Sequence, residues 1–426
     1  MTLGATLEIA PATEPLDAVV SVPGSKSYTN RMLPAAALAR GDSILSGVLD
    51  SEDTQVMMES LRRLGIKVEH DPAARTARIQ GCGGIIPAKS ADLHLANSGT
   101  SIRFLAAFVA AGNGTFTLDG NARMRERPIG DLAAALEGAG VAAKCVKNDG
   151  KPPLVVEACG LQGGNLSVRG DVSSQFLSAL LLAAPVATGE TRIKVEGDLV
   201  SKPYVDMTLA VMKEFGAQAA RDGYKYFTIA PTGYDGRQAM VEPDASAASY
   251  FFGAAAIVGG RTVVSGLGTE SLQGDLGFVQ LLERMGCTVK MTAKETTVIG
   301  GPLVGIDCDM RHVSDTVPTL AAVACFARGT TRIRNVANAR VKECDRLAAV
   351  ATELSRLGAR VVEHPDGLDI TPGPMTGGAV DTYDDHRMAM SLSLVGLKVP
   401  GVVIRNPGCT AKTYPEFFAD LATATR

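Results

Sequence analysis

The sequence feature that most restricts the fold is a helix ending that recurs along the chain. A helix-like stretch closes on a glycine and is followed at once by a strand-like segment, as in LRRLGIKVEH. The closing glycines are Gly65, Gly140, Gly216, Gly286 and Gly358, which lie 75, 76, 70 and 72 residues apart. Glycine readily adopts the left-handed conformation that ends a helix, and it lets the chain turn directly into a strand. The even spacing indicates a repeated structural unit of about 70 residues.

A second, more apolar helix, followed by a short turn and a β-rich segment, occurs six times. IRFLAAFVAAGNGTFTL and FLSALLLAAPVATGETRIKV are two of the six copies. One unit therefore reads helix, strand, helix, strand, and such a unit is too small to bury its apolar faces alone. Six units match an α/β protein made of two three-unit domains. A solenoid is the alternative, but solenoid repeats are shorter, at about 20–47 residues.

The chain length also favours two domains, because 426 residues exceed the size of one ordinary core. Turn-rich stretches near 22–24 and 243–246 predict where the chain crosses from one domain to the other. We therefore expect an N-terminal three-unit domain over residues 23–244. The C-terminal three-unit domain then combines residues 1–22 with residues 245–426, so that the first short strand belongs with the C-terminal half.

Composition excludes several classes of partner. With 42 basic and 45 acidic residues the net charge is −3, so no overall basic field attracts nucleic acid or an anionic membrane. Apolar runs such as LSALLLAAPV stop well short of the roughly 20 residues that a membrane-spanning helix needs. Any binding of anions must therefore be local.

The cysteines and the N-terminal segment predict the compartment. The eight cysteines lie far apart and contain no C-x-x-C pair, which argues against a zinc site and against a disulfide scaffold. The first residues lack the basic and apolar regions of a secretory signal. We therefore expect reduced cysteines and a cytoplasmic protein.

Cationic and hydroxyl-bearing residues recur at predicted helix starts in the N-terminal half. The segment PGSKSYTNR places Lys26, Ser27 and Arg31 at the start of an apolar helix, where free backbone N–H groups and the helix dipole favour anions. An ordinary solvated helix cap is the alternative, and the spacing of a Walker P-loop is missing. The segment ANSGTSIRF repeats this design around Gly99, whose lack of a side chain lets a ligand approach the backbone.

Two further segments of the same half carry donors. The loop DGNARMRERPIG contains Arg123 among three alternating arginines, which could also form a solvated strand face. Neutral donors that suit hydroxyls and phosphate oxygens follow in GDVSSQF and LVSKPYVD. They are Ser173, Ser174, Gln175, Ser201 and Tyr204.

The C-terminal half carries acids as well as cations. Asp315 precedes an apolar helix in MRHVSDTVPTLAAVA, where a helix cap is the simplest interpretation. The segment NARVKECDRL contains Asn338, Lys342, Glu343 and Arg346, and a surface helix with internal ion pairs is its alternative interpretation. The last unit opens with His386 and Arg387 in YDDHRMAM, and CTAKTYPEF supplies Lys412.

The recurrence of these segments is stronger evidence for an anion-binding site than any single segment is. Helix starts in a repeated fold tend to point in one direction. If both domains aim them at a shared cleft, six cations converge there, and two phosphate-bearing ligands fit such a field. The six are Lys26, Arg123, Lys342, Arg346, Arg387 and Lys412.

Eight segments in the same order along nearly the whole chain resemble the 5-enolpyruvylshikimate-3-phosphate synthase family. They are PGSKSYTNR, NSGTSIRF, RMRERPIG, GDVSSQF, SKPY, VKECDRL, YDDHRMAM and CTAKTYPEF. The resemblance implies transfer of the enolpyruvyl group of phosphoenolpyruvate to the 5-hydroxyl of shikimate 3-phosphate, with release of phosphate. It implies no metal and no organic cofactor, small molecules as the only partners, and a monomer. The implied fold has two similar domains of three βαβαββ units each, an inside-out α/β barrel arrangement with the active site in the cleft between the domains.

The resemblance also assigns roles to residues of this chain. It implies a shikimate 3-phosphate site formed by Lys26, Ser27, Arg31, Ser173, Ser174, Gln175, Ser201, Tyr204, Asp315, Asn338 and Lys342. It implies a phosphoenolpyruvate site formed by Lys26, Gly99, Arg123, Gln175, Arg346, His386, Arg387 and Lys412. The reaction needs both a base and an acid, so we expect Asp315 to take the 5-hydroxyl proton, and Glu343, aided by Lys26, to manage the proton at the methylene carbon.

One loop departs from the family pattern, and two other functions remain open. The family's loop usually reads N-A-G-T-A-x-R-P, whereas this chain has Ser98, Ser101 and Phe104 at three of those positions. The departure bears on the shape of the phosphoenolpyruvate pocket and on sensitivity to the inhibitor glyphosate. The first alternative is the sister transferase that acts on UDP-N-acetylglucosamine and typically uses a loop cysteine, which is missing here. The second is a noncatalytic protein that binds phosphorylated metabolites.

Overall fold

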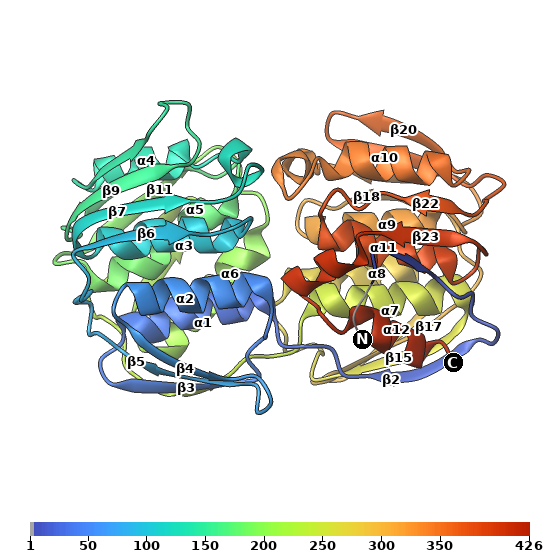
Figure 1. Cartoon of the computed structure of the whole chain (residues 1–426), viewed down its shortest axis with the longest axis horizontal. Coiled ribbons are helices and arrows are strands. Elements are labelled where there is room, and N and C mark those ends of the chain that lie inside the picture. The colour runs from blue at the N-terminus through green and yellow to red at the C-terminus, as the bar shows by residue number, and fades with distance from the viewer. Residues whose placement is uncertain (1–3) are drawn as a thin grey trace. The chain divides into compact units, whose positions relative to one another are not determined.

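The computed structural model describes residues 4–426, which separate into two compact units (Figure 1). The central unit is Gly24–Val241. The terminal unit combines the described residues up to Pro23 with Glu242–Arg426. Residues 1–3 of the predicted first segment lie outside the described residues.

The central unit alternates helices and strands throughout. Its helices are α1 (Lys26–Leu38), α2 (Glu52–Arg63), α3 (Gly99–Ala110), α4 (Gly130–Gly138), α5 (Ser174–Ala183) and α6 (Lys202–Glu214), with short 3₁₀ turns η1 (Met124–Glu126) and η2 (Ala184–Val186). Its strands are β3 (Asp42–Ser46), β4 (Lys67–Asp71), β5 (Thr76–Gln80), β6 (Ser90–His94), β7 (Asn113–Asp119), β8 (Ala142–Cys145), β9 (Leu154–Cys159), β10 (Gly164–Arg169), β11 (Thr191–Glu196), β12 (Ala219–Asp222), β13 (Tyr226–Ile229) and β14 (Gln238–Met240).

The terminal unit has the same alternation. Its helices are α7 (Ala245–Val258), α8 (Phe278–Arg284), α9 (Val317–Ala324), α10 (Arg346–Arg356), α11 (His386–Gly396) and α12 (Phe417–Ala424), and its 3₁₀ turns are η3 (Gly274–Gly277), η4 (Ser314–Thr316), η5 (Ala337–Val341) and η6 (Pro407–Lys412). Its strands are β1 (Thr6–Glu8), β2 (Leu16–Val20), β15 (Gly260–Ser265), β16 (Thr288–Met291), β17 (Glu295–Ile299), β18 (Asp307–Asp309), β19 (Thr331–Arg334), β20 (Arg360–His364), β21 (Gly367–Thr371), β22 (Gly378–Val380) and β23 (Val402–Arg405).

Each repeat forms a small sheet of its own. In the middle repeat of the central unit the order along the chain is β6, α3, β7, α4, β8, β9, and the order in the sheet is β6-β7-β9-β8. The first two strands run parallel and the later pairs run antiparallel. Sheets β10-β11-β13-β12 and β18-β19-β21-β20 repeat this order. The predicted α/β fold of βαβαββ units is confirmed.

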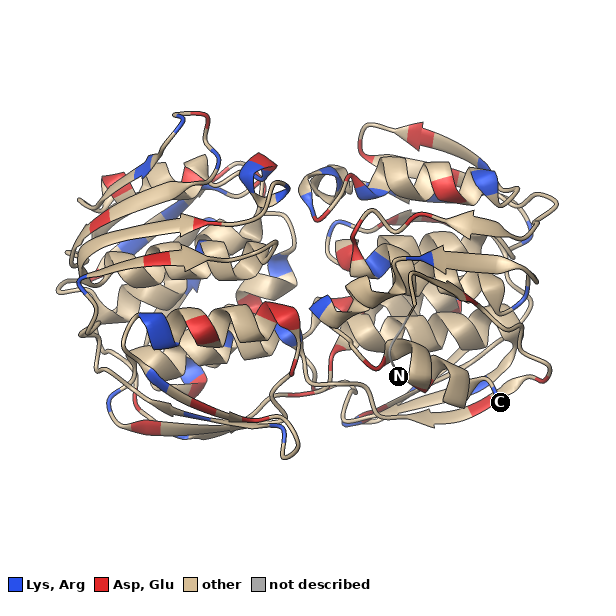
Figure 2. Ribbon diagram, viewed as in Figure 1, with Lys and Arg blue, Asp and Glu red and all other residues tan. Residues whose placement is uncertain are grey.

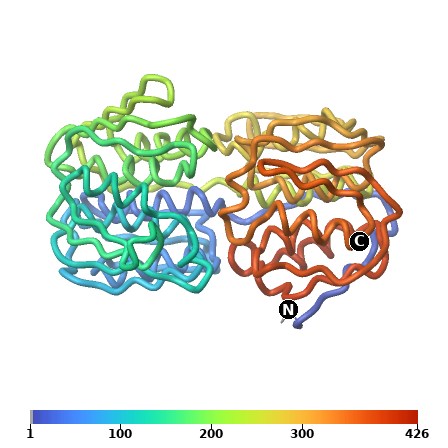
Figure 3. The backbone as a smooth tube through the Cα atoms, turned by 90° about the horizontal axis from the view of Figure 1, so that it is seen from above, coloured from blue at the N-terminus to red at the C-terminus, as the bar shows by residue number. Residues whose placement is uncertain are grey.

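Segments distant in sequence complete the sheets at the start and end of each unit. In the central unit β14 runs parallel to β3, so the last strand of the unit completes its first sheet. In the terminal unit β2 runs parallel to β15, and β1 runs antiparallel to β23. Figure 3 shows the blue N-terminal segment running through that unit, where its partner β15 is yellow and its partner β23 is red. The first two described strands therefore belong with the C-terminal half of the sequence.

The core of each unit is a set of buried helices, and the sheets lie outside them. In the central unit α3 is buried over its whole length, and α1 and α5 are buried apart from one residue each. In the terminal unit α9 and α11 are buried throughout. Strand β11 alternates buried and exposed residues, as expected when one face of a sheet covers helices and the other faces water. Figure 2 accordingly shows few charges along the central helices and more at helix ends, turns and strands.

The recurring glycines end their helices as the sequence predicts. Gly65, Gly140, Gly216, Gly286 and Gly358 all have positive φ, from 82° to 112°. A residue with a Cβ would be strained at each of these positions. Within residues 4–426, no helix is both long enough and apolar enough to cross a membrane.

Candidate active site

In the central unit, the start of α1 holds a buried ion pair. Ser25 caps the helix by accepting a hydrogen bond from the backbone N–H of Tyr28. The Nζ of Lys26 lies 3.7 Å from Oδ2 of Asp53, which is in the first turn of α2, and both side chains are nearly inaccessible. The site is therefore more than a solvated cap, because the lysine is withdrawn from water and held by an acid of the neighbouring helix.

Arg31, one turn further along α1, is buried among neutral acceptors. Its guanidinium donates to the hydroxyl of Thr208 at 2.8 Å and to the carbonyl oxygens of Ser27 and Tyr204 at 2.8 and 3.1 Å. It also lies 5.2 Å from the ring centre of Phe104. Burial lowers the pKa of Arg31 to about 10. A buried cation with this set of neutral neighbours gains energy when an anion approaches.

The start of α3 brings Gly99 against two buried guanidinium groups. Arg103 donates to the carbonyl of Gly99 at 3.1 Å and to Oε1 of Gln175 at 2.9 Å. Arg127 donates to the backbone and side-chain oxygens of Asn97, both at 3.0 Å. A Cβ on Gly99 would lie 2.4 Å from Nη2 of Arg127 and 2.6 Å from Nη1 of Arg103. The absence of a side chain at this position therefore lets the two arginines close over the backbone.

The loop of alternating arginines is not a strand face, so that interpretation is wrong. The loop forms η1, and its arginines have different environments. Arg123 pairs with Glu126 at 2.7 Å on the surface, and Arg125 pairs with Asp119. Arg127 points inward to Asn97.

Neutral donors and acceptors lie at the starts of α5 and α6. Ser173 accepts from the backbone N–H of Gln175 at 3.3 Å, and Nε2 of Gln175 donates to the hydroxyl of Thr100 at 3.2 Å. Gln175 therefore connects α5 to α3 through both ends of its amide. Ser201 occupies the N-cap position of α6 in the left-handed conformation with φ 52°, and Tyr204 follows in the first turn. The structure thus brings the predicted residues of α1, α3, α5 and α6 to helix starts of one unit.

In the terminal unit, Arg346 is the centre of a buried charge cluster. Its guanidinium donates to Asp385 at 2.8 and 3.2 Å, to Glu343 at 2.7 Å and to Asp315 at 3.2 Å. Arg346 is 1% exposed and Asp385 is 0% exposed. Burial alone would lower the pKa of Arg346, but the three carboxylates outweigh burial and raise the pKa. The arginine is therefore permanently charged.

The carboxylate of Asp315 contacts three cationic side chains, and it does not cap a helix. Its Oδ2 accepts from Arg387 at 2.7 Å, while its Oδ1 lies 3.2 Å from Arg346 and 3.5 Å from Lys342. Thr316 is the N-cap residue of α9, and Asp315 lies in η4 just before it. The interpretation of Asp315 as a cap is therefore wrong. Its carboxylate is held for ionic contacts instead.

The charged segment before α10 is not a surface helix, so that interpretation is wrong as well. Asn338 lies in η5 and donates to the hydroxyl of Ser314 at 3.4 Å. Lys342 and Glu343 lie in the turn between η5 and α10, and Glu343 is buried. The turn therefore directs these side chains to Ser314, Asp315 and Arg346.

The starts of α11 and η6 complete the cluster. Asp385 caps α11 by accepting from the backbone N–H of Arg387 at 2.9 Å. Arg387 also donates to the hydroxyls of Tyr250 and Ser246, each at 3.3 Å. His386 is fully buried behind Asp385, with its Nδ1 3.5 Å from Oδ1 of that residue, and Lys412 is buried at the end of η6.

The expected site residues did not include four side chains that contact them within their own units. They are Asp53, Arg103, Arg127 and Asp385. Arg103, Arg127 and Asp385 lie in the sequence motifs given above. A charged residue near the start of an apolar helix is the sequence feature that could have identified them. Asp53 has no comparable signal, because an acid in the first turn of a helix is common.

The loop that departs from the family pattern forms a small polar contact. Ser98 caps α3 and donates to the hydroxyl of Ser101 at 2.8 Å, and Ser101 reaches the backbone oxygen of Asp53 at 3.5 Å. Phe104 packs under Arg31. The two serines thus connect the loop around Gly99 to the helix that holds Asp53.

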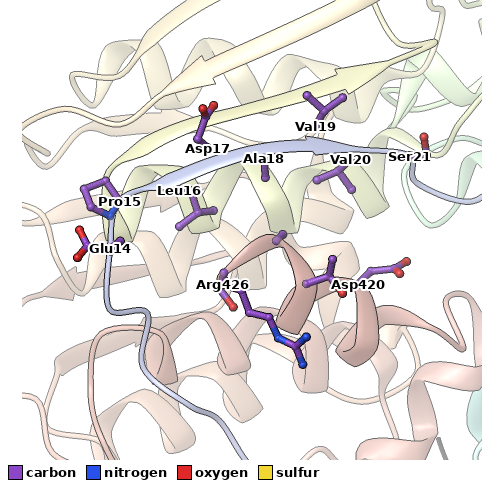
Figure 4. A pocket seen from close by; sticks show the side chains of 13 residues that line it. Glu14, Pro15, Leu16, Asp17, Ala18, Val19, Val20, Ser21, Asp420 and Arg426 are labelled. Atoms are coloured by element: carbon purple, nitrogen blue, oxygen red, sulfur yellow. The ribbon is translucent and has the colours of Figure 1, made fainter.

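A hollow of about 660 Å³ lies apart from these clusters, between β2 and the end of α12 (Figure 4). Residues of 14–21 line it together with Asp420 and residues 423–426. Leu16, Ala18 and Val20 point toward α12, whereas Asp17 points to the other side. None of the predicted site residues lines this hollow.

Comparison with known proteins gives one consistent result. Residues 11–421 match the family described as EPSP synthase (3-phosphoshikimate 1-carboxyvinyltransferase). The chain is 49% identical to the 3-phosphoshikimate 1-carboxyvinyltransferase of Nostoc punctiforme over 415 residues, which cover 97% of both chains. It is 46% identical to the enzyme of the same name from Shewanella sp. strain ANA-3, over 95% of this chain and 96% of that one.

Solved structures agree with the sequence relatives. The EPSP synthase of Acinetobacter baumannii superposes with a TM-score of 0.81 at 27% identity, over 98% of both chains. The enolpyruvyl transferase NikO of Streptomyces tendae has the same fold, with a TM-score of 0.78 at 22% identity, over 98% of this chain and 97% of that one. This chain belongs to the EPSP synthase family.

Proposed function

We propose that this chain is a 3-phosphoshikimate 1-carboxyvinyltransferase of the shikimate pathway. It moves the enolpyruvyl group of phosphoenolpyruvate to the 5-hydroxyl of shikimate 3-phosphate and releases phosphate, as the family relation supports. The structural observation that carries the proposal is Asp315, a carboxylate that three cations hold at the starts of α9, α10 and α11. A fixed carboxylate among cations suits a reaction that removes a proton next to anionic substrates.

The reaction requires three proton transfers at two atoms, the 5-hydroxyl oxygen and C3 of phosphoenolpyruvate. The 5-hydroxyl oxygen forms a bond to C2 of phosphoenolpyruvate, and C3 gains a proton, which gives a tetrahedral ketal phosphate. The new methyl group then loses a proton, the C2–O bond to phosphate breaks, and the enol double bond returns. Asp315 accepts the hydroxyl proton in the first step. Glu343, with Lys26, manages the proton at C3.

The geometry around the two acids favours different tasks. Two arginines and one lysine contact Asp315, so its carboxylate is fixed in position, as a general base requires. Glu343 accepts a hydrogen bond from Nη2 of Arg346 at 2.7 Å, and the same guanidinium also contacts Asp385 and Asp315. This buried contact fixes the carboxyl of Glu343 in place, and we propose that the carboxyl exchanges the proton at C3.

The remaining cations bind and orient the substrates. We propose that Lys26, Arg31 and the hydroxyls of α5 and α6 bind shikimate 3-phosphate, together with Asn338 and Lys342. In the same proposal, phosphoenolpyruvate is bound by Lys26, Gly99, Arg123, Gln175, Arg346, His386, Arg387 and Lys412. Arginines recognise carboxylate and phosphate through paired hydrogen bonds, and fixed charges stabilise the charge that develops during the reaction.

One assay tests the proposal against both alternatives. Purified protein is mixed with shikimate 3-phosphate and phosphoenolpyruvate, and released phosphate is measured. Phosphate release with this pair supports the proposal. Release only with UDP-N-acetylglucosamine as acceptor identifies the sister transferase, and binding without release in either mixture identifies a noncatalytic binding protein.

Replacing Gly99 by alanine is expected to raise the KM for phosphoenolpyruvate. The new Cβ would overlap the guanidinium groups of Arg127 and Arg103, so both must shift. Overpacking of this kind costs about 1–3 kcal/mol, which corresponds to roughly 5- to 150-fold in KM if the cost falls on the bound state. Steady-state kinetics measure the change, and an unchanged KM contradicts the assignment of Gly99 to this substrate.

Gly138 provides the matched control. It lies within α4, and a Cβ there would meet nothing within 4 Å. Gly138→Ala is expected to leave KM unchanged and to stabilise the helix slightly, because alanine favours helix more than glycine does.

We further propose a cytoplasmic monomer in which the two units close on the substrates. Both units supply residues to the proposed reaction, so productive binding requires them to act on the same molecules. Small-angle X-ray scattering is expected to show a smaller radius of gyration when shikimate 3-phosphate saturates the protein. Phosphoenolpyruvate alone serves as the comparison, and an unchanged radius with shikimate 3-phosphate contradicts closure.

A further inference from the structure

The turn that precedes α11 has a strained backbone. Tyr383 and Asp384 both have φ of 54°, in the left-handed region. Among the described residues they are the one adjacent pair of non-glycine residues with positive φ. Aspartate tolerates this conformation, whereas for a bulky side chain such as tyrosine it is an outlier. Strained backbone persists only where surrounding contacts hold it, and it is often found at functional sites.

A buried acid from another helix holds the first part of this turn. Glu353 lies in α10 and is 0% exposed. Its Oε1 accepts a hydrogen bond from the hydroxyl of Tyr383 at 2.7 Å, and its Oε2 accepts from the backbone N–H of Asp381 at 3.1 Å. Arg356 balances the charge at 3.0 Å. Partial loss of water around the phenol, and then the hydrogen bond to Glu353, raise the pKa of Tyr383 to about 12, so the phenol remains a donor.

A second contact holds the other end of the turn. The side-chain amide of Asn406, which lies between β23 and η6, donates to Oδ1 of Asp384 at 3.1 Å. The backbone N–H of Asp385 donates to the carbonyl of Thr382 at 2.9 Å. The turn is therefore fixed by α10 on one side and by the segment before η6 on the other.

The residue that follows this turn, Asp385, is a central member of the charge cluster around Arg346. Asp385 follows Asp384 directly and caps α11. Its Oδ2 accepts a hydrogen bond from Nε of Arg346 at 2.8 Å. Arg387 is two residues further and contacts Asp315 at 2.7 Å. A change in the backbone at residues 383 and 384 would move Asp385 and the first turn of α11 together, because no flexible segment separates them.

We propose that Glu353 and Tyr383 are positioning residues, which hold the strained turn so that Asp385, Arg346 and Arg387 keep the geometry that phosphoenolpyruvate requires. Neither side chain belongs to the charge cluster itself. Their effect reaches the substrate only through Asp385 and the start of α11. This inference rests on the proposed function for its kinetic readout, and its structural part is independent of that function.

Tyr383→Phe is the first test, because it removes one hydroxyl and keeps the ring. We expect the KM for phosphoenolpyruvate to rise by about 10-fold, the size of effect of one hydrogen bond to a charged group. The KM for shikimate 3-phosphate is expected to stay within about 2-fold, since that site is assigned mainly to other residues. Tyr226→Phe is the matched control: Tyr226 is 46% exposed, close to the 42% of Tyr383, and it lies on the surface of β13. It is expected to change neither KM.

A purely structural role gives a different result. If the hydroxyl only stabilises the fold, Tyr383→Phe lowers the melting temperature and the fraction of active protein, so kcat falls while both KM values remain. That outcome overturns the proposal, as does unchanged kinetics. Glu353→Gln is the second variant, because glutamine keeps the volume and one acceptor oxygen for Tyr383. We expect a smaller rise in the same KM, by about 3-fold; a rise in the KM for shikimate 3-phosphate instead contradicts the proposal.

The two hypotheses fail in distinguishable ways. If the native chain releases no phosphate, the proposed function fails. The positioning role is then decided by a crystal structure of Tyr383→Phe. Loss of the 2.8 Å contact between Arg346 and Asp385 supports the role, and its retention overturns the role.

Discussion

Asp315→Asn is expected to lower kcat by about 10²- to 10⁴-fold, the usual contribution of a positioned general base. Asparagine keeps the size of the side chain and one oxygen that accepts a hydrogen bond from Arg387 or Arg346. It cannot accept the proton of the 5-hydroxyl. We therefore expect both substrates still to bind, as measured by calorimetry, while steady-state phosphate release shows the loss.

The control for this variant is another carboxylate that binds arginine. Asp369 on β21 accepts from Arg334 at 2.7 Å, and its side chain is partly exposed. Asp369→Asn is expected to leave kcat unchanged. Near-normal turnover in Asp315→Asn would remove Asp315 from the proton-transfer scheme.

Arg346→Met is expected to destabilise the protein by about 3–5 kcal/mol, because removal of one partner of a buried ion pair leaves charge without compensation. Methionine fills much of the space, but Asp385 and Glu343 lose the cation that balances them. Urea unfolding, followed by circular dichroism, measures the change in the free energy of unfolding. Activity should be lost as well, since Arg346 is assigned to phosphoenolpyruvate.

Two further variants test the cause of this loss. Arg169→Met removes an arginine that binds Asp171 through two hydrogen bonds of 3.0 and 2.9 Å on the surface, and it is expected to change stability little. Adding Asp385→Asn to Arg346→Met should recover part of the stability, because a neutral amide is less costly to bury than a carboxylate. If Arg169→Met and Arg346→Met are equally destabilising, burial of the cluster is not the cause.

The sequence predicts the repeated architecture because local rules control it. The five glycines mark helix ends by a property of single residues, the left-handed conformation, and all five have positive φ. The α/β fold of βαβαββ units and the family relation are confirmed. The local sequence pattern suggested three interpretations that are wrong: a helix cap for Asp315, a strand face for the arginine loop and a surface helix for the segment before α10. Each of them includes at least one contact distant in sequence that a local pattern cannot show: Asp315 with Arg387, Arg127 with Asn97, and Asn338 with Ser314.

The contacts that shape the site could not be predicted in the same way. Lys26 and Asp53 are 27 residues apart in different helices, and Glu353 and Tyr383 are 30 residues apart. Neither spacing matches a local pattern, because the pairs form only when helices of one unit pack together. The left-handed conformation of Tyr383 is also invisible in sequence, since tyrosine has no preference for it.

The pairing of β2 with β15 has a consequence for synthesis of the chain on the ribosome. The central unit is complete once β14 has emerged, since every strand of its sheets then exists. Strand β2 leaves the ribosome early, yet its partner begins at Gly260, and β1 waits for β23 near the end of the chain. At translation rates of about 5–20 residues per second, β2 remains without its partner for roughly 10–50 s. The N-terminal segment therefore stays without its sheet partners for most of the time that the chain takes to be synthesised.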